Sequence, residues 1–128
     1  MIKFGIQQGL NVARLGLTED QILTVAMLAD KTGYDSLWYM DHSNVPQWNH
    51  AIVNDPWVML SAIASVTQKL ELGTCVTDAV RRHPSNIALA TITLDRVSHG
   101  RGTLGIGAGE AQNIKEFKIQ WDKPVGRF

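Results

Sequence analysis

The sequence is poor in the residues that build crosslinks and metal centres. Cys75 is the only cysteine among 128 residues, so an internal disulfide is excluded. Four histidines are scattered along the chain and form no cluster of zinc ligands, so we expect no metal site. An excess of charge is also lacking, because 12 Lys and Arg residues balance 12 Asp and Glu residues. Without a basic surplus, the chain is not expected to bind nucleic acid or an anionic membrane surface.

Long hydrophobic runs are absent as well. No apolar run approaches the roughly 20 residues of a membrane span. The N-terminus begins with strand-like residues and shows no charged leader followed by an apolar core, so the sequence predicts a cytoplasmic protein. Hydrophobic residues make up 45% of the chain, enough for a buried core. We therefore expect one domain over residues 1–128.

Strand and helix patterns alternate along the chain. Helix starts are marked by Thr18 with Gln21 as a capping box and by prolines at 56 and 84, and helix ends by Gly33 and Gly100. The segments with the composition of short buried strands are 2–8, 34–40, 70–77 and 102–106.

This alternation indicates an α/β fold with about four parallel strand-helix units. Crossovers of a dozen or more residues favour parallel strands in right-handed units. A parallel sheet must be covered on both faces or closed into a barrel. A TIM (β/α)8 barrel needs eight units and about 250 residues, so this chain supplies about half of one.

Chemistry is expected where the strands end. The fourth strand is followed by GAGEAQN, in which Glu110 is either a site residue or a helix-start carboxylate. The Gly-x-Gly-x-Gly spacing disfavours a Rossmann dinucleotide site, so the glycines are interpreted as allowing a cofactor or a loop to approach closely. Cys75 is expected to be a small apolar filler.

The second strand delivers Asp41 and His42. Adjacent strand residues point to opposite faces, so both can face one ligand only if the strand has already become a loop. The alternative is a solvated loop histidine. Trp48, in the long polar loop that follows, is the only tryptophan whose context favours a site. Arg81 and Arg82 are expected to be solvated, with anion binding as the alternative.

Taken together, these residues resemble the bacterial-luciferase-like superfamily of flavin and deazaflavin oxidoreductases over essentially the whole chain. Within it, MDH followed by a nearby Trp and then GAGEAQN is similar to the branch that uses coenzyme F420. The blocks that carry the resemblance are KFGI, GYDSLWYMDH, DPWVMLSAIASVTQKLELGT, RRHP, TLDRVSHGRGTLGIGAGE and WDKPVGRF.

The resemblance implies roles for individual residues. His42 would exchange a proton with the substrate hydroxyl, Glu110 would be the proton partner of the deazaflavin ring, and Trp48 would lie near the substrate. A non-prolyl cis peptide bond is implied at Cys75–Val76, beneath the ring. The cofactor-binding positions implied are Asp41, Cys75, Val76, Asp78, Ala108, Gly109 and Asn113.

The implied activity is hydride transfer between coenzyme F420 and a substrate alcohol or related carbon, as in alcohol or sugar-phosphate dehydrogenases. Methylene-tetrahydromethanopterin reductases usually have aspartate in place of Glu110 and are less favoured. Two other hypotheses stay open, an FMN-dependent luciferase-like monooxygenase and an inactive half-barrel that acts as a structural or assembly module.

The resemblance also implies that the chain is a fragment, the N-terminal half of a (β/α)8 barrel. The segments that complete the barrel in relatives would follow Phe128. Besides a small-molecule substrate, the expected partner is a second copy in a homodimer or a complementary barrel half.

Overall fold

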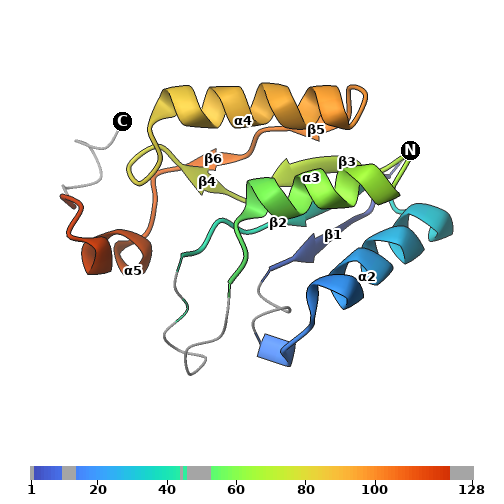
Figure 1. Ribbon diagram of the computed structural model, residues 1–128, viewed down its shortest axis with the longest axis horizontal. Coiled ribbons are helices and arrows are strands. Elements are labelled where there is room, and N and C mark those ends of the chain that lie inside the picture. Colours follow the sequence, from blue (N-terminus) through green and yellow to red (C-terminus); the bar gives the residue numbers. More distant parts are fainter. Residues whose placement is uncertain (1, 10–13, 44, 46–52, 122–128) are drawn as a thin grey trace.

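The computed structural model describes residues 2–9, 14–43, 45 and 53–121 and alternates strands with helices (Figure 1). The strands are β1 (Gly5–Gln8), β2 (Ser36–Tyr39), β3 (Glu71–Thr74), β4 (Thr77–Asp78), β5 (Gly102–Thr103) and β6 (Ile106–Gly107). The helices are α2 (Glu19–Thr32), α3 (Pro56–Val66), α4 (Pro84–Val97), the short α5 (Ala111–Ile114) and the 3₁₀ turn η2 (Lys115–Phe117). None of the described helices is long and apolar enough to cross a membrane.

The strands form a parallel sheet in the order β1-β2-β3-β5, and β4 pairs with β6 in a second, two-stranded parallel sheet. Because β4 follows β3 and β6 follows β5 along the chain, the two-stranded sheet continues two strands of the four-stranded sheet beyond an interruption. The prediction of an α/β fold with about four parallel strand-helix units is confirmed.

The helices begin and end where local chemistry dictates. Thr18 and Gln21 form the predicted capping box, and the helix they open ends at Gly33, whose φ of 90° suits glycine. Asp55 caps α3 by accepting hydrogen bonds from the backbone N–H groups of its first turn, and Pro56 occupies the first helical position. These signals are local, so the sequence alone sufficed to predict them.

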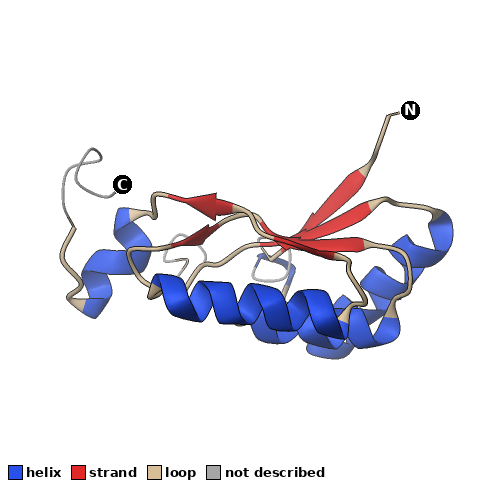
Figure 2. Ribbon diagram, turned by 90° about the horizontal axis from the view of Figure 1, so that it is seen from above, coloured by secondary structure: helices blue, strands red, loops and turns tan. Residues whose placement is uncertain are grey.

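The hydrophobic core lies between the sheet and helices α2, α3 and α4, which all cover the same side of the sheet (Figure 2). The fully buried side chains that join the two layers include Ile22 and Ile63 from the helices and Leu37 and Leu72 from the strands. Burying each of them contributes about 1.5–3 kcal/mol. This packing fixes the strands and therefore the loops that follow them.

On the opposite side of the sheet, Trp38 lies across its neighbouring strands. A Cβ added at Gly73 would lie 2.6 Å from the indole ring, and one added at Gly5 would lie 3.1 Å from the indole nitrogen. The indole N–H donates a 2.9 Å hydrogen bond to the Ser36 hydroxyl. Glycine is therefore needed at Gly73 to leave room for the ring and at Gly5 to leave room for the Ser36 hydroxyl, which would lie 2.4 Å from an added Cβ.

Two predicted strands are each divided in the structure. The segments expected at 70–77 and 102–106 become β3 with β4 and β5 with β6. At the division, the Thr74 hydroxyl donates to the Gly105 carbonyl (2.8 Å) and accepts from the Gly105 N–H (3.2 Å). A side chain thus replaces a rung of the backbone ladder. The predicted non-prolyl cis peptide bond at Cys75–Val76 is confirmed and lies in the same interruption.

Arg101 anchors the opposite ends of the strands. Its guanidinium donates to the carbonyl oxygens of Ala64 (3.2 Å), Thr67 (3.0 Å), Leu70 (2.9 Å) and Ser98 (2.7 Å). The last carbonyls of a helix have no partners within the helix, so a side-chain donor at this place stabilises the end of α3. The same contacts fix the chain that enters β3 and β5.

Candidate functional site

The ends of β2, β4 and β6 enclose a hollow of about 220 Å³. Parallel strands place their carboxyl ends at one edge of the sheet, which is where α/β proteins build their sites. The residues that line the hollow are Met40, Asp41, His42, Cys75, Val76, Asp78, Ala108, Gly109, Glu110 and Asn113. Every predicted catalytic and cofactor-binding residue is therefore at this hollow. Trp48, predicted to lie near the substrate, is outside the described residues.

His42 and Glu110 meet at the rim of the hollow. Their closest atoms, Nδ1 of the imidazole and Oε2 of the carboxylate, are 4.0 Å apart. The His42 side chain is mostly buried and Glu110 is mostly exposed. Gln112 joins them, since its amide nitrogen donates to Glu110 (2.8 Å) and lies 3.5 Å from His42 Nδ1. Two groups capable of proton transfer are thus adjacent without being locked in a short ion pair.

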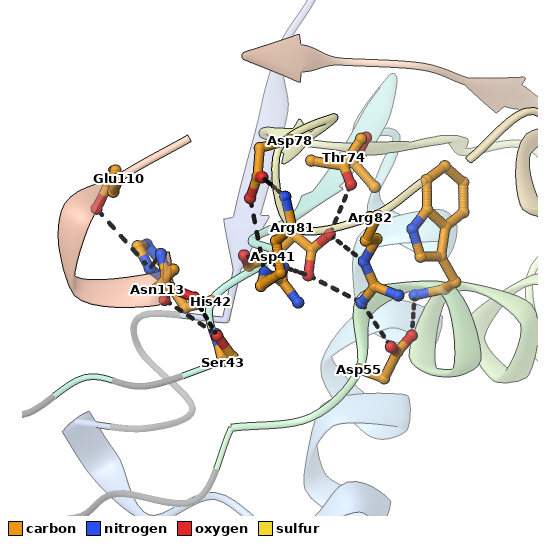
Figure 3. Close-up of polar contacts among 12 residues, drawn as sticks. Asp41, His42, Ser43, Asp55, Thr74, Asp78, Arg81, Arg82, Glu110 and Asn113 are labelled. Atoms are coloured by element: carbon orange, nitrogen blue, oxygen red, sulfur yellow. Dashed lines mark hydrogen bonds and ion pairs between the residues drawn. The ribbon is translucent and has the colours of Figure 1, made fainter. Parts of the chain in front are cut away.

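Asn113 connects this pair to the loop after β2. Its side-chain oxygen accepts from the Ser43 backbone N–H (3.0 Å), and its amide nitrogen lies 2.8 Å from His42 Nδ1 (Figure 3). The Ser43 hydroxyl donates back to the Asn113 carbonyl (3.3 Å). The loop of β2 and the helix after β6 are therefore joined directly beside His42.

Asp41 points away from His42, into a buried ion network (Figure 3). Arg81 donates to it through a short contact, Arg82 donates from Nε (2.7 Å) and Nη2 (3.0 Å), and the Thr77 hydroxyl donates at 2.6 Å. Arg82 also pairs with Asp55 (2.6 Å), the cap of α3. The network thus joins β2, β4, α3 and the segment before α4.

The network decides the protonation of Asp41. Burial alone would raise the pKa of this carboxyl, but hydrogen bonds from Arg82, Thr77 and Arg81 lower the pKa by more, so it lies below its ordinary value. Burial lowers the pKa of Arg82, and the carboxylates of Asp41 and Asp55 raise it by more. Asp41 is therefore a fixed negative charge between two positive ones.

The arginines correct one expectation from the sequence. Arg81 and Arg82 were expected to be solvated, but their side chains are only 14% and 24% exposed. The reason is Asp41, a buried carboxylate some 40 positions earlier in the chain that needs compensating charge. A second correction concerns Cys75, which is exposed and not a core filler, because it follows Gly73 by two residues and so is expected on the same side as Trp38, away from the core.

Asp78 shapes the turn that leads to α4. One of its carboxylate oxygens accepts from the backbone N–H groups of Val80 (3.1 Å) and Arg81 (2.6 Å), and the other lies 3.6 Å from Arg81 Nε. Gly109 lies against it, since an added Cβ would be 3.2 Å from the Asp78 carboxyl carbon. A glycine with a φ of 77° is needed at 109 to keep this side of the hollow open.

Sequence reasoning missed several residues of this site. Ser43, Thr77 and Gln112 were not selected, because hydroxyl and amide residues are common and only their contacts distinguish them. Arg81 and Arg82 were noted but expected to be solvated. The signal that could have identified them is that two arginines are adjacent just before the helix that begins at Pro84. Among the described residues, no group of three or more His, Cys, Asp and Glu side chains could hold a metal ion.

Known proteins are similar to this chain over most or nearly all of its length. A family model described as luciferase-like monooxygenase matches residues 3–128. The phthiodiolone/phenolphthiodiolone dimycocerosates ketoreductase of Mycobacterium tuberculosis is 35% identical over 147 residues, covering 99% of this chain and 38% of that protein. The F420-dependent glucose-6-phosphate dehydrogenase of Beutenbergia cavernae is 37% identical over 112 residues, covering 84% of this chain and 32% of that protein. The chain thus spans about a third of the length of these relatives.

Two solved structures have similar backbones. An F420-dependent secondary alcohol dehydrogenase in complex with an F420-acetone adduct superposes with a TM-score of 0.84 at 28% identity, covering 98% of this chain and 37% of that one. A monooxygenase from Streptomyces bottropensis superposes with a TM-score of 0.81 at 28% identity, covering 99% of this chain and 40% of that one. Family model, relatives and backbone agree: the chain belongs to the luciferase-like monooxygenase family and has the fold of the N-terminal half of a TIM (β/α)8 barrel.

Proposed function

We propose that this chain carries the ring site and the proton-transfer residues of a coenzyme F420-dependent oxidoreductase, which transfers a hydride between the deazaflavin and a substrate alcohol or related carbon. The observation that carries the proposal is the approach of His42 and Glu110 to 4.0 Å at the rim of a hollow. The F420 dependence named for two of the similar proteins supports it.

The residues around the hollow fit a flat ring with a polar edge. Val76 is half exposed and Cys75 is exposed, so their side chains offer an apolar surface to the hollow. Ala108, Gly109 and Asn113 line the hollow beside it. Ligand sites typically combine such an apolar floor with a few converging polar groups. We assign the cofactor-binding role to these residues on that ground.

When bound, the deazaflavin supplies the hydride exchange itself. His42 then exchanges the proton of the substrate oxygen, and Glu110 serves as the proton partner on the ring side. The walls of the hollow position the reactants, since orientation alone lowers a barrier by several kcal/mol. Asp41 holds the loop of His42 through Arg81 and Arg82, so its contribution to the site is mainly to positioning.

The rival within the same family is an FMN-dependent monooxygenase, favoured by the likeness to the Streptomyces bottropensis monooxygenase. A methylene-tetrahydromethanopterin reductase activity is a further possibility within the F420 branch, since a coenzyme F420-dependent tetrahydromethanopterin reductase of Methanopyrus kandleri superposes with a TM-score of 0.76 at 25% identity. We favour the alcohol or sugar-phosphate class because Glu110 matches it.

Fluorescence titration of the 128-residue chain with coenzyme F420 and, separately, with FMN tests the choice of cofactor. We expect saturable binding of F420 and weaker binding of FMN. Gly109→Val should abolish the binding, because it fills the hollow where an added Cβ would already meet Ile114 at 2.7 Å. Glu71→Gln, at an exposed ion pair on the opposite end of β3, is the matched control. Selective tight binding of FMN would overturn the proposal.

The molar mass of the chain, from light scattering, accompanies the titration. We propose a homodimer or association with a complementary barrel half, because β1 and β5 are the two ends of the sheet order. A folded dimer with no affinity for either cofactor would favour a structural or assembly role instead.

In an enzyme that contains this segment, His42→Ala should lower turnover by roughly 10²- to 10⁴-fold, the usual effect of losing an acid-base group. Unchanged turnover would remove His42 from the mechanism.

A further inference from the structure

The Ser43 backbone N–H fixes the orientation of the Asn113 side chain. A backbone N–H can only donate, and its partner at 3.0 Å is the side-chain oxygen of Asn113. The two ends of an amide side chain are otherwise hard to tell apart, and a contact with an obligate donor identifies the oxygen. The amide nitrogen of Asn113 is therefore the atom that faces His42.

That nitrogen lies 2.8 Å from Nδ1 of His42. An amide nitrogen has hydrogens to donate and no lone pair to accept with, so Nδ1 must be the acceptor. The Gln112 amide nitrogen, 3.5 Å from the same Nδ1, is a second donor. Glu110 could accept a hydrogen from Nδ1, but its oxygen is 4.0 Å away and is already bonded to Gln112. The two amide donors therefore make Nδ1 a hydrogen-bond acceptor that carries no hydrogen.

We infer that Asn113 is a positioning residue that fixes the tautomer of His42, with the hydrogen of the neutral imidazole on Nε2. Neutral imidazole carries one hydrogen, and an occupied acceptor at Nδ1 leaves it on the other nitrogen. Asn113 is 3% exposed and is also bonded to Ser43 through its backbone carbonyl, so its amide cannot rotate without breaking several contacts. No hydrogen bond to Nε2 comes from the part of the chain that the structure describes.

The consequence rests on the proposed function. In this tautomer the neutral His42 presents its Nε2–H to a substrate oxygen. It therefore donates a hydrogen bond to a carbonyl oxygen more readily than it removes a proton from an alcohol. A neutral imidazole that donates to a carbonyl is an established form of electrophilic assistance. For neutral His42, this tautomer therefore suits the carbonyl form of the substrate, and removal of a proton from the alcohol form requires the hydrogen to be on Nδ1 instead.

The tautomer is measured directly by long-range ¹H–¹⁵N NMR of the full chain labelled with ¹⁵N-histidine, at alkaline pH where imidazole is neutral. His42→Gln assigns the signals by removing them. We expect Nε2 of His42 to be the protonated nitrogen. A wild-type spectrum with Nδ1 protonated overturns the inference, and this result needs no variant to fold.

Asn113→Asp is the decisive variant, because it keeps the shape of the side chain. One carboxylate oxygen can still accept from Ser43, while the other replaces the donor beside Nδ1 with an acceptor. We expect the hydrogen to move to Nδ1. Gln112→Ala is the matched control and should leave it on Nε2. A spectrum of Asn113→Asp identical to that of the wild type would refute the role of Asn113.

The measurement requires no cofactor, so it is independent of the F420 titration. If His42 carries its hydrogen on Nε2 but the chain does not bind F420, the proposed function is overturned and the role of Asn113 stands. Binding of F420 by a chain whose His42 carries its hydrogen on Nδ1 would overturn only the role of Asn113.

Discussion

Replacing Asp41 by Asn should strongly destabilise the fold. The Asp41 side chain is 1% exposed and accepts hydrogen bonds from Arg81, Arg82 and Thr77. An asparagine has nearly the same shape, but it carries no charge and turns an amide N–H toward a guanidinium that can only donate. Both arginine side chains would remain mostly buried without the carboxylate between them.

The size of the loss follows from these contacts. Removing one partner from a buried ion pair costs about 3–5 kcal/mol, because the remaining charge is left uncompensated. Arg82 keeps Asp55 at 2.6 Å, while Arg81 keeps the backbone carbonyl of residue 41 at 2.9 Å and the carboxylate of Asp78 at 3.6 Å from its Nε. We therefore expect a loss of about 3–4 kcal/mol, at the lower end of that range. For a domain whose total stability is about 5–15 kcal/mol, that is a large share.

Urea unfolding followed by circular dichroism measures this loss. Glu71→Gln is the control. It breaks the ion pair between Lys3 and Glu71, whose side chains are 68% and 48% exposed, respectively. Exposed pairs of this kind contribute little to stability, because water and salt screen the two charges. If Asp41→Asn costs no more than this control, the network does not hold the fold and the reasoning fails.

The same contacts predict a pH dependence. The pKa of folded Asp41 lies below its unfolded value of about 3.9, so the carboxylate stabilises the fold fully above that value. This contribution is lost as the pH falls through the folded pKa. The difference in stability between wild type and Asp41→Asn should therefore shrink below about pH 4. A difference that is constant down to pH 2 would contradict the assignment.

Three further predictions concern the scaffold. Arg101→Leu should cost about 2–4 kcal/mol in urea unfolding, because four carbonyl oxygens lose their donor, and a loss as small as that of Glu71→Gln would contradict it. Gly73→Ala should cost about 1–3 kcal/mol and shift tryptophan fluorescence, because its Cβ would be 2.6 Å from the Trp38 ring; unchanged stability and emission would count against it. Burial, with a smaller contribution from the Glu19 carboxylate, raises the pKa of Tyr39 to about 12, so stability should decline between about pH 10 and 12 in wild type and less in Tyr39→Phe. Equal declines would refute the Tyr39 prediction.

The parts of the fold that could be predicted from the sequence are those set by neighbours in the chain. Thr18 with Gln21, Pro56 at the start of α3, and Gly33 each act within one helical turn, and all three were predicted correctly. The strand divisions were not predicted, because the Thr74 hydroxyl must meet a glycine 31 positions later to replace a backbone rung. Nothing local distinguishes that threonine from any other strand threonine.

The same distinction applies to the site. The positions of His42 and Glu110 after their strands were predicted from strand patterns and the family resemblance, and the structure brings them to one hollow. Their roles stay predictions. What could not be predicted is which partner each side chain takes, since Asp41 turns to arginines 40 and 41 positions away and Asn113 to a residue 71 positions away. Those choices depend on the three-dimensional packing of distant segments.

The interruption at Thr74 and Gly105 divides the strands into a lower level that packs on the core and an upper level that leads to the site. Below it, β1, β2, β3 and β5 pair with one another and pack on the apolar faces of α2, α3 and α4. Above it, β4 and β6 pair with each other in a separate sheet of the described residues, and they lead into the loops that line the hollow. Apart from the Asp41 network, which joins β4 to α3, substitutions at the upper level therefore leave the core of the lower level in place. With this division, residues around the hollow can change by mutation while the core of the lower level stays the same. Proteins similar to this chain accordingly include both a dehydrogenase and a monooxygenase.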